Sequence, residues 1–215
     1  MNSTAPLVLG TVILAAGASS RMGCPKLLLP WRDTTVIGSI LQQWKNIGAK
    51  QIAFVCKSGD SDLMAELDRL QHPATDRIIN PDPARGMFSS IQCAAQWRGW
   101  SPDLTHWGIA LGDQPHLATE TLSTLIQSAR SSVTGICQPS HNGRARHPVL
   151  LPRKEFAELP TTQRSTLKEF LAEHGAAVTL IPVRDDGLDL DIDTPEDYRL
   201  VSNRFVERAV PSPDP

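Results

Sequence analysis

The chain has 215 residues, of which 40% are hydrophobic and 20% are charged, and this composition predicts one globular domain with a sizeable core. The formal net charge of −2 excludes the strong positive charge that is typical of nucleic-acid-binding and membrane-surface proteins. Residues 1–6 carry no Lys or Arg and the apolar run after them is too short to cross a bilayer, so we expect a cytoplasmic protein.

Strands and helices alternate in the first half of the chain. Leu7–Ala15 is short, apolar and β-branched at several positions, which predicts a strand buried on both faces. Thr34–Ile47 carries its apolar residues on one helical stripe, and Gly48 is the expected stop of that helix. The next expected elements are the strand Gln51–Cys56, the helix Asp62–Leu70, the strand Arg77–Ile79, the helix Ser89–Trp97 and the strand His106–Leu111.

The alternation continues in the second half of the chain. The expected elements are a helix over Thr119–Arg130, strands over Val133–Cys137 and Pro148–Leu151, a helix over Ser165–His174 and a strand over Ala177–Val183. Repeated strand–helix–strand units predict an α/β fold, as a single three-layer α/β/α domain with a mostly parallel sheet. We expect this domain to span residues 1–205 and residues 206–215 to form a frayed tail.

The stretch after the first strand, LAAGASSRMGCPK (residues 14–26), is small, glycine-containing and followed by cations. A loop at the carboxyl end of such a strand lies where open α/β sheets bind ligands, and small residues there leave backbone N–H groups free for anionic oxygens. Gly17 and Gly23 have the wrong spacing for a dinucleotide fingerprint or a P-loop. A plain strand-to-helix connection stays open, but Arg21 and Lys26 favour a loop that holds phosphate.

Lone or alternating aspartates mark two candidate metal positions. Asp113 ends an apolar strand directly before a Gln-Pro turn, where a carboxylate points into the ligand crevice, although a turn aspartate would look the same. Helix initiation alone explains the residues around Pro195, with Thr194 as the N-cap in a capping-box pattern. It does not explain the three alternating acids before them, which would share one face and repel without a cation or donors: Asp189, Asp191 and Asp193.

Two further segments are candidate binding regions. In NPDPARGMFSSIQCA (residues 80–94), Asn80 can donate and accept hydrogen bonds and Gly86 allows a base to approach closely. Its serines, Ser89 and Ser90, either contact a ligand or merely cap the next helix. In NGRARHPVLLP (residues 142–152), a basic cluster either grips a phosphate or forms a solvated loop: Arg144, Arg146 and His147.

The stretch LAAGASSRMGCPKLLLPW (residues 14–31) resembles the signature L-A-A-G-x-S-x-R-M-G-x-x-K of the nucleotidyltransferases that attach a nucleotide to the molybdenum cofactor. The resemblance continues in order through NPDPARGMFSSIQCA, GDQPHL, HPVLLP and DIDTPEDY and covers most of residues 7–201. It implies a Rossmann-like fold similar to nucleotide-diphospho-sugar transferases. GDQP together with DIDTPEDY points to the cytidylyltransferase branch, and Ala16 stands where guanylyl-transferring relatives commonly have Gly.

The resemblance implies an enzyme that needs Mg²⁺, transfers CMP from CTP to the molybdopterin phosphate of the molybdenum cofactor and releases pyrophosphate. It implies Arg21, Lys26 and Asp113 as catalytic residues, and Asp113 as a metal ligand with Asp193 preferred over Asp191 as the second. The implied nucleotide-binding residues are Leu14, Ala15, Ala16, Gly17, Arg21, Lys26, Asn80, Gly86 and Ser90. The implied acceptor-binding residues are Arg144, Arg146 and His147.

The acceptor is the least specified part of this prediction, because Arg146 stands where the family usually has Gly directly before the His-Pro pair. A sugar phosphate or another small phosphorylated acceptor therefore stays an alternative. A second alternative is a non-catalytic carrier or chaperone of the finished cofactor. The expected partners are CTP and the molybdenum cofactor as substrates, with a molybdenum hydroxylase or its maturation chaperone as recipient, and neither nucleic acid nor membrane.

Overall fold

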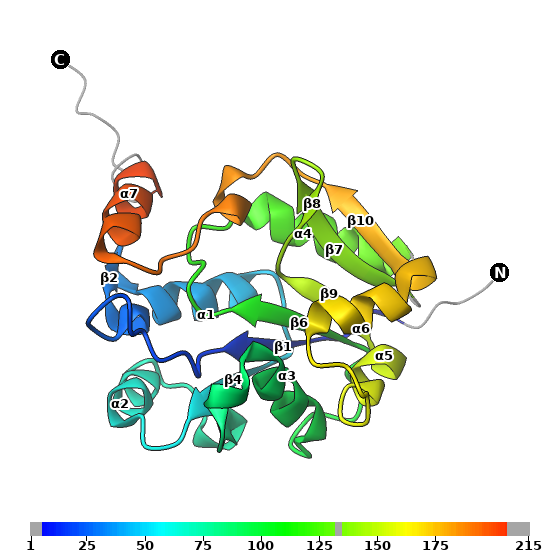
Figure 1. The fold of residues 1–215 in the computed structure, drawn as a ribbon, viewed down its shortest axis with the longest axis horizontal. Coiled ribbons are helices and arrows are strands. Elements are labelled where there is room, and N and C mark those ends of the chain that lie inside the picture. Colours follow the sequence, from blue (N-terminus) through cyan, green and yellow to red (C-terminus); the bar gives the residue numbers. More distant parts are fainter. Residues whose placement is uncertain (1–5, 132–134, 206–215) are drawn as a thin grey trace.

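The computed structural model describes residues 6–131 and 135–205, in which strands and helices alternate around one mixed β-sheet (Figure 1). The strands lie in the order β10-β7-β9-β6-β1-β4-β5, and β8 pairs with β7 beside that order. All pairs within β6-β1-β4-β5 are parallel, as is β10 with β7, whereas β9 runs antiparallel between β6 and β7. The strands of this sheet are β1 (Leu9–Leu14), β4 (Gln51–Lys57), β5 (Arg77–Asn80), β6 (His106–Leu111), β7 (Ile136–His141), β8 (Arg144–Ala145), β9 (Val149–Pro152) and β10 (Val178–Pro182).

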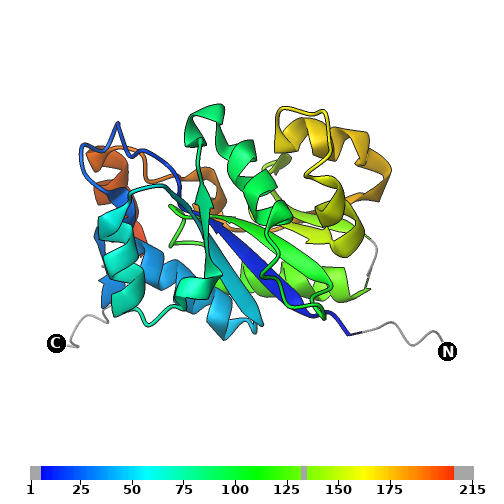
Figure 2. The same cartoon turned by 90° about the horizontal axis from the view of Figure 1, so that it is seen from below.

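Helices cover both faces of the sheet, which confirms the predicted three-layer α/β/α fold with a mostly parallel sheet (Figure 2). One layer contains α1 and α4, and the opposite layer contains α3, α5 and α6. Among the described helices, none combines the length and apolarity that crossing a bilayer requires. The helices are α1 (Val36–Asn46), α2 (Ser61–Arg69), α3 (Met87–Gln96), α4 (Thr119–Ser131), α5 (Arg153–Glu158), α6 (Leu167–Glu173) and α7 (Pro195–Phe205).

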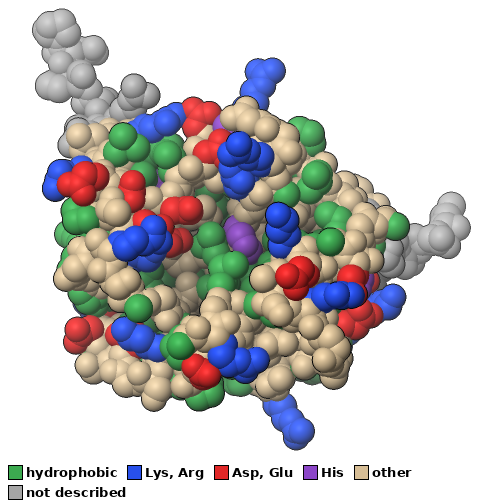
Figure 3. Space-filling view, in the orientation of Figure 1, with side chains coloured by type: hydrophobic (Ala, Val, Ile, Leu, Met, Phe, Trp, Pro, Cys, Tyr) green, Lys and Arg blue, Asp and Glu red, His purple; other side chains and the backbone are tan. Residues whose placement is uncertain are grey.

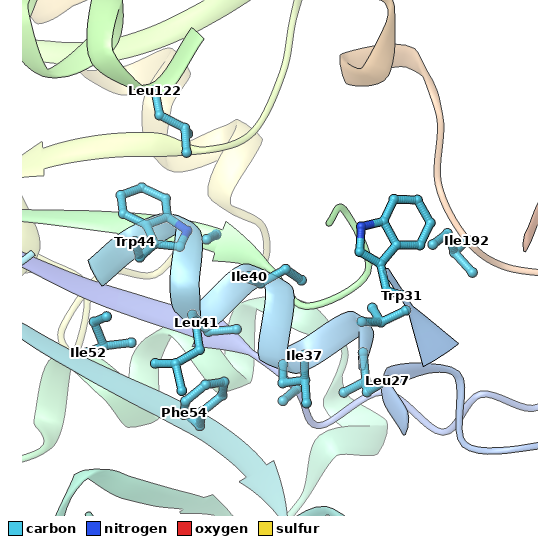
Figure 4. Packing of buried hydrophobic residues seen from close by; sticks show 14 of the residues in the cluster. Leu27, Trp31, Ile37, Ile40, Leu41, Trp44, Ile52, Phe54, Leu122 and Ile192 are labelled. Carbon is cyan, nitrogen blue, oxygen red and sulfur yellow. The ribbon is translucent and has the colours of Figure 1, made fainter. Parts of the chain in front are cut away.

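Two hydrophobic cores lie on the two faces of the central strands. In β1, Ile13 enters the core beneath α1 and α4 while Val12 enters the core beneath α3 and α5, as the two-residue period of a strand requires. In β4, Phe54 enters the core beneath α1 and α4, and Val55 enters the core beneath α3 and α5. Figure 4 shows the first core, in which Trp44 and other side chains of α1 pack against the sheet. A strand buried on both faces is what the sequence predicted for β1.

Most predicted helix boundaries agree with the structure to within a few residues. α1 begins at Val36 because the Thr35 hydroxyl caps it, and Gly48, with φ of 86°, ends it as expected. At α7, the Thr194 hydroxyl accepts from Asp197 N–H while the Asp197 carboxylate accepts from Thr194 N–H, which confirms the predicted capping box.

Several short elements escaped the prediction. The hairpin of β2 (Pro30–Trp31) and β3 (Thr34–Thr35), strand β8 and helix α5 were not predicted, because each is too short to show a period. The strand expected over Val133–Cys137 begins at Ile136 and extends to His141, and residues 133 and 134 lie outside the described residues, as does the expected tail over 206–215.

Candidate active site

The loop between β1 and the 3₁₀ turn η1 (Lys26–Leu28) presents small residues at the carboxyl edge of the sheet. Ala15 donates its N–H to the Val55 carbonyl at 2.8 Å, and Met22, only 5% exposed, anchors the far part of the loop in the core. Ser19, between these anchors, and Gly23, directly after Met22, adopt positive φ values of 51° and 73°. The loop is thus held in place at Ala15 and at Met22.

The loop after β6 approaches this first loop closely. Gly112 donates its N–H to the Leu14 carbonyl at 3.0 Å, and a Cβ at position 112 would lie 2.6 Å from that carbonyl oxygen. Only glycine fits this approach without a backbone shift. The glycine of the GDQP motif therefore lets the following aspartate, Asp113, lie against the loop that carries Lys26.

Four charged side chains from three segments form one cluster at this edge. Lys26 Nζ lies 2.5 Å from Asp113 Oδ2 and 2.9 Å from Asp193 Oδ1, and the lysine side chain is only 12% exposed. Arg21 contacts the other Asp193 oxygen at 2.7 Å, but its side chain is 70% exposed. An enclosed ammonium group thus lies between two carboxylates, with a guanidinium group on the solvent side.

The electrostatics of this cluster favour the charged forms of Lys26 and Asp193. Burial alone would lower the pKa of Lys26, but the neighbouring Asp113 and Asp193 carboxylates raise it above its ordinary value. Burial would raise the pKa of Asp193, but Lys26 and Arg21 hold it below its ordinary value. The cluster therefore carries fixed charges of both signs at neutral pH.

Asp191 is a third carboxylate beside the cluster. It accepts a hydrogen bond from Gln114 Nε2 at 2.9 Å, and its side chain is exposed to the cleft. The surrounding protein partly desolvates the Asp191 carboxylate, and this desolvation raises its pKa. The negative charge of Asp113 raises it further. Desolvation and neighbouring carboxylates both disfavour the negative charge of Asp191. A bound cation would therefore stabilise that charge.

Asp113 has a carboxylate oxygen that could bind a hard divalent cation. Asp113 Oδ1 is buried and has no hydrogen-bond partner among the described residues. Mg²⁺ is usually bound by one or two carboxylates together with waters and substrate phosphates. Across residues 6–131 and 135–205 no three His, Cys, Asp or Glu side chains are arranged as a metal cage, so a cation here would need oxygens from a substrate.

A pocket of about 220 Å³ opens directly beside the charged cluster, between the first loop and α3. Figure 3 shows a hollow on this face with hydrophobic side chains on its floor and charged side chains along its rim. Such a pocket fits a flat ring joined to an anionic group, since apolar walls end at the ammonium group of Lys26. The residues predicted to hold the nucleotide that line it are Leu14, Ala15, Ala16, Gly17, Lys26, Gly86 and Ser90, and Asp113 also lines it.

Asn80 does not line this pocket but lies behind it, only 1% exposed. Its amide Nδ2 donates to the hydroxyls of Ser89 and Ser90, each at 2.9 Å, and its Oδ1 accepts from Asp82 N–H at 2.9 Å. The helix α3 begins at Met87, so the serines lie in its first turn and the reading of them as N-caps is wrong. Asn80 instead fixes the turn that presents Ser90 to the pocket.

A second pocket of about 790 Å³ adjoins the first, and the two share Met87 and Leu111 as walls. The three predicted acceptor residues line it, together with Asp191 and with Lys168 of α6. Lys168 was not predicted, because a lysine on a helix has no distinctive neighbours in the sequence.

The basic cluster of this second pocket carries less free charge than its sequence suggests. The Arg146 guanidinium pairs with Asp189 through Nε at 2.8 Å and through Nη2, and holds the pKa of Asp189 below its ordinary value. Burial lowers the pKa of His147, whose Nδ1 faces the Ile109 carbonyl at 3.2 Å, so the ring is neutral and donates from Nδ1. Arg144 is exposed and forms no ion pair with any described residue.

The three alternating acids do not share one face, contrary to the prediction. Asp189 ends a 3₁₀ turn, η5 (Asp186–Asp189), which rotates its side chain away to Arg146. Asp191 and Asp193 do face the cluster, each with a hydrogen-bond donor. Gln114 was missed as the donor to Asp191, although it directly follows Asp113 in the quoted GDQP motif.

A model of a protein family, the MobA-like NTP transferase domain, matches residues 11–178 of this chain. The molybdenum cofactor cytidylyltransferase of Escherichia coli K12 is 27% identical over 201 residues, which cover 91% of this chain and 96% of that protein. The nicotine blue oxidoreductase of Paenarthrobacter nicotinovorans is 29% identical over 208 residues, which cover 91% of this chain and 97% of that protein.

Among solved structures, Rv0371c from Mycobacterium tuberculosis is similar with a TM-score of 0.75 at 30% identity, covering 92% of this chain and 98% of that chain. A structure of Rv0371c in complex with manganese is similar with a TM-score of 0.68 at 29% identity, covering 90% and 97% of the two chains. The family model and these similarities each extend over most of the chain. The chain is a nucleotidyltransferase that belongs to the MobA-like NTP transferase family.

Proposed function

We propose that this protein transfers CMP from CTP to the terminal phosphate of molybdopterin in the molybdenum cofactor and releases pyrophosphate. The observation that carries the proposal is the position of Lys26 between Asp113 and Asp193, on the wall of the first pocket, which adjoins the larger second pocket. Similarity to a molybdenum cofactor cytidylyltransferase supports the choice of both substrates.

In the proposed reaction an oxygen of the acceptor phosphate attacks the α-phosphorus of CTP, and the bond from that phosphorus to the bridging oxygen of the β-phosphate breaks. Pyrophosphate leaves with the electron pair of that bond, so no protein nucleophile is needed. The protein aligns the two phosphates and neutralises the charge that develops on them. Lys26 neutralises charge from inside the site and the exposed Arg21 does so from the solvent side.

Asp113 would hold Mg²⁺ in this proposal, with Asp193 preferred over Asp191 as the second ligand. When bound, Mg²⁺ supplies Lewis-acid neutralisation of the triphosphate charge. The unpartnered Oδ1 of Asp113 is the atom of this chain that best fits such a ligand role. The complex of Rv0371c with manganese supports a divalent cation in a protein of this fold.

Base preference in this proposal depends on the walls of the first pocket. Ala16 is 8% exposed and lines that pocket, so its methyl group takes up room that a glycine would leave open. A cytosine ring is smaller than a guanine ring, and a pocket discriminates strongly when a wrong base leaves buried polar groups unpaired. We therefore assign CTP as the preferred triphosphate.

The second pocket is the proposed acceptor site. Arg144 and Lys168 offer positive charge toward an anionic acceptor, while the pairing of Arg146 with Asp189 leaves Arg146 a smaller electrostatic role. A sugar phosphate would also satisfy these cations, so it remains the alternative acceptor. A carrier without catalysis is the alternative of another class.

One experiment separates these possibilities. The protein is incubated with Mg²⁺, with each of the four nucleoside triphosphates in turn, and with molybdopterin, a sugar phosphate or no acceptor. Pyrophosphate is measured and products are identified by mass. The proposal expects pyrophosphate and a cytidylylated product with CTP and molybdopterin only. Transfer to a sugar phosphate supports the alternative acceptor, and binding of the cofactor without pyrophosphate release supports the carrier.

A further inference from the structure

Asp191 and Asp193 lie on a segment that we call the C-terminal strap, residues 183–194, which connects β10 to α7 and contains η5. Figure 1 shows this segment in orange, crossing from β10 toward α7. Leu188 and Ile192 anchor it by burial, at 2% and 0% exposure. The strap contains no strand of the sheet, so its position depends on contacts with neighbouring loops.

His116 makes the central contact between the strap and the loop after β6. Its Nε2 lies 3.0 Å from the carbonyl oxygens of both Gly187 and Leu190, and the residue is 4% exposed. Both partners are acceptors, so Nε2 carries the proton and donates to them. Burial lowers the pKa of His116, which favours this neutral form.

The ring of His116 is held firmly in this position. A Cβ at Gly187 would lie 3.0 Å from His116 Cδ2, so the strap packs closely against the ring. The Trp31 ring lies 6.2 Å away, centroid to centroid. One imidazole ring therefore holds the strap through two of its carbonyl groups.

Two neighbouring side chains reinforce the same contact. Asp185, 6% exposed, accepts hydrogen bonds from Ala118 N–H at 3.0 Å and from the Thr121 hydroxyl at 2.7 Å. Gln114 Nε2 donates to the Asp191 carboxylate. The loop that carries Asp113 thus also determines where the strap places Asp191.

We propose that His116 is a positioning residue, which sets the distance between Asp113 and the strap carboxylates by holding the Gly187 and Leu190 carbonyls. Leu190 directly precedes Asp191, so a shift of its carbonyl moves the attachment point of that carboxylate. This inference rests on the proposed function, because it concerns the cation site of that reaction. Residues that orient metal ligands typically change metal affinity or activity by about 10- to 100-fold when they are replaced.

The test compares His116→Phe, which keeps a ring but removes the donor, with His116→Gln, whose amide can still donate. Binding of Mn²⁺ is titrated by electron paramagnetic resonance in the presence of a non-hydrolysable CTP analogue, and kcat and KM for CTP are measured separately. H116F is expected to weaken Mn²⁺ binding by about tenfold or more and to lower kcat similarly, with KM for CTP nearly unchanged. H116Q is expected to recover most of both losses.

His72→Phe is the matched control for the loss of a buried histidine. His72 is 5% exposed, its Nε2 faces the Asp76 carbonyl at 3.4 Å, and burial lowers its pKa as it does for His116. H72F should lower the melting temperature without changing Mn²⁺ affinity. If H116F also changes only the melting temperature, the positioning role is wrong.

A second variant keeps the inference testable if H116F does not fold. Gln114→Leu removes the donor to Asp191 and leaves His116 in place, and it should weaken Mn²⁺ binding in the same direction. Wild-type Mn²⁺ affinity in Q114L would show that the contacts of this loop do not set the cation site, and would overturn the inference. If the wild-type protein releases no pyrophosphate with any acceptor, the proposed function fails, and the Mn²⁺ titrations still decide the role of His116.

Discussion

Replacing Lys26 by alanine should have opposite effects on turnover and on the binding of a free divalent cation. The Lys26 ammonium contacts Asp113 and Asp193 at 2.5 and 2.9 Å and is largely enclosed. Charge neutralisation of the phosphates is lost in Lys26→Ala, so turnover with CTP should fall by about 100-fold or more, or roughly 2.7 kcal/mol at the transition state.

The same substitution leaves two carboxylates without their shared cation. Two unit charges about 4 Å apart interact by about 4 kcal/mol near a protein surface, and solvent and rearrangement reduce this value. Removal of the ammonium group should therefore tighten binding of Mn²⁺ to the nucleotide-free protein by about tenfold or more, or about 1.4 kcal/mol. Lower turnover with tighter cation binding is a combination that general damage to the fold does not produce.

The pH dependence of stability gives a third readout of the same change. Because the folded protein holds the pKa of Asp193 below its unfolded value, this residue contributes stability above about pH 4 that is lost as the pH falls through the folded pKa. Lys26→Ala removes a main cause of that lowered pKa. The melting temperature of the variant should therefore lie further below the wild-type value at pH 7 than at pH 3.

The assays are pyrophosphate release under saturating CTP, Mn²⁺ titration without nucleotide, and thermal unfolding at the two pH values. Lys50→Ala is the matched control, since Lys50 also pairs with an aspartate, Asp103, but is about half exposed and lies outside the cluster. Lys50→Ala should change neither turnover nor Mn²⁺ binding appreciably. The reasoning is refuted if Lys26→Ala retains near-wild-type turnover, or if it binds free Mn²⁺ more weakly than the wild type.

Three further substitutions test other parts of the site. Asp113→Asn should remain folded by circular dichroism yet lose about 1000-fold or more in kcat, because a metal-bound charge is worth several kcal/mol at the transition state; a folded variant with near-normal kcat would remove Asp113 from the metal site. Asp191→Asn should lower turnover but raise the melting temperature at pH 7. At pH 3 the melting temperature should not rise, because a carboxyl group whose folded pKa is raised reduces the stability of the folded protein only above its unfolded pKa. Ala16→Gly should reduce the preference for CTP over GTP in kcat/KM, which is measured with both triphosphates and molybdopterin; an unchanged ratio would show that the Ala16 methyl group does not select the base.

Much of the fold was predictable because its central elements have clear periods. β1, β4 and β6 are short apolar strands separated by amphipathic helices, and their carboxyl ends meet at one edge. Helix ends were predictable where capping chemistry is local, as at Thr194. The antiparallel direction of β9 was not predictable, since direction depends on pairing partners far away in the sequence.

The site was predictable to the extent that each residue follows the end of a strand. Lys26 and Asp113 occupy such positions, and the sheet brings them together. Asp189 shows the limit of this reasoning, because alternation in sequence indicates a shared face only in an extended segment, and a 3₁₀ turn interrupts it here. The contacts of His116 could not be predicted from the sequence either, because its partners lie about 70 residues away on a segment without a long helix or strand.

A crystal structure of the wild-type protein with Mn²⁺ and a non-hydrolysable CTP analogue tests the central claim most directly, because anomalous scattering locates the metal. The account predicts manganese within about 2.2 Å of Asp113 and of a strap carboxylate. It also predicts Lys26 turned toward the phosphates and the cytosine ring against Ala16. Manganese without Asp113 as a ligand, or a nucleotide bound outside the pocket beside Lys26, would contradict the account.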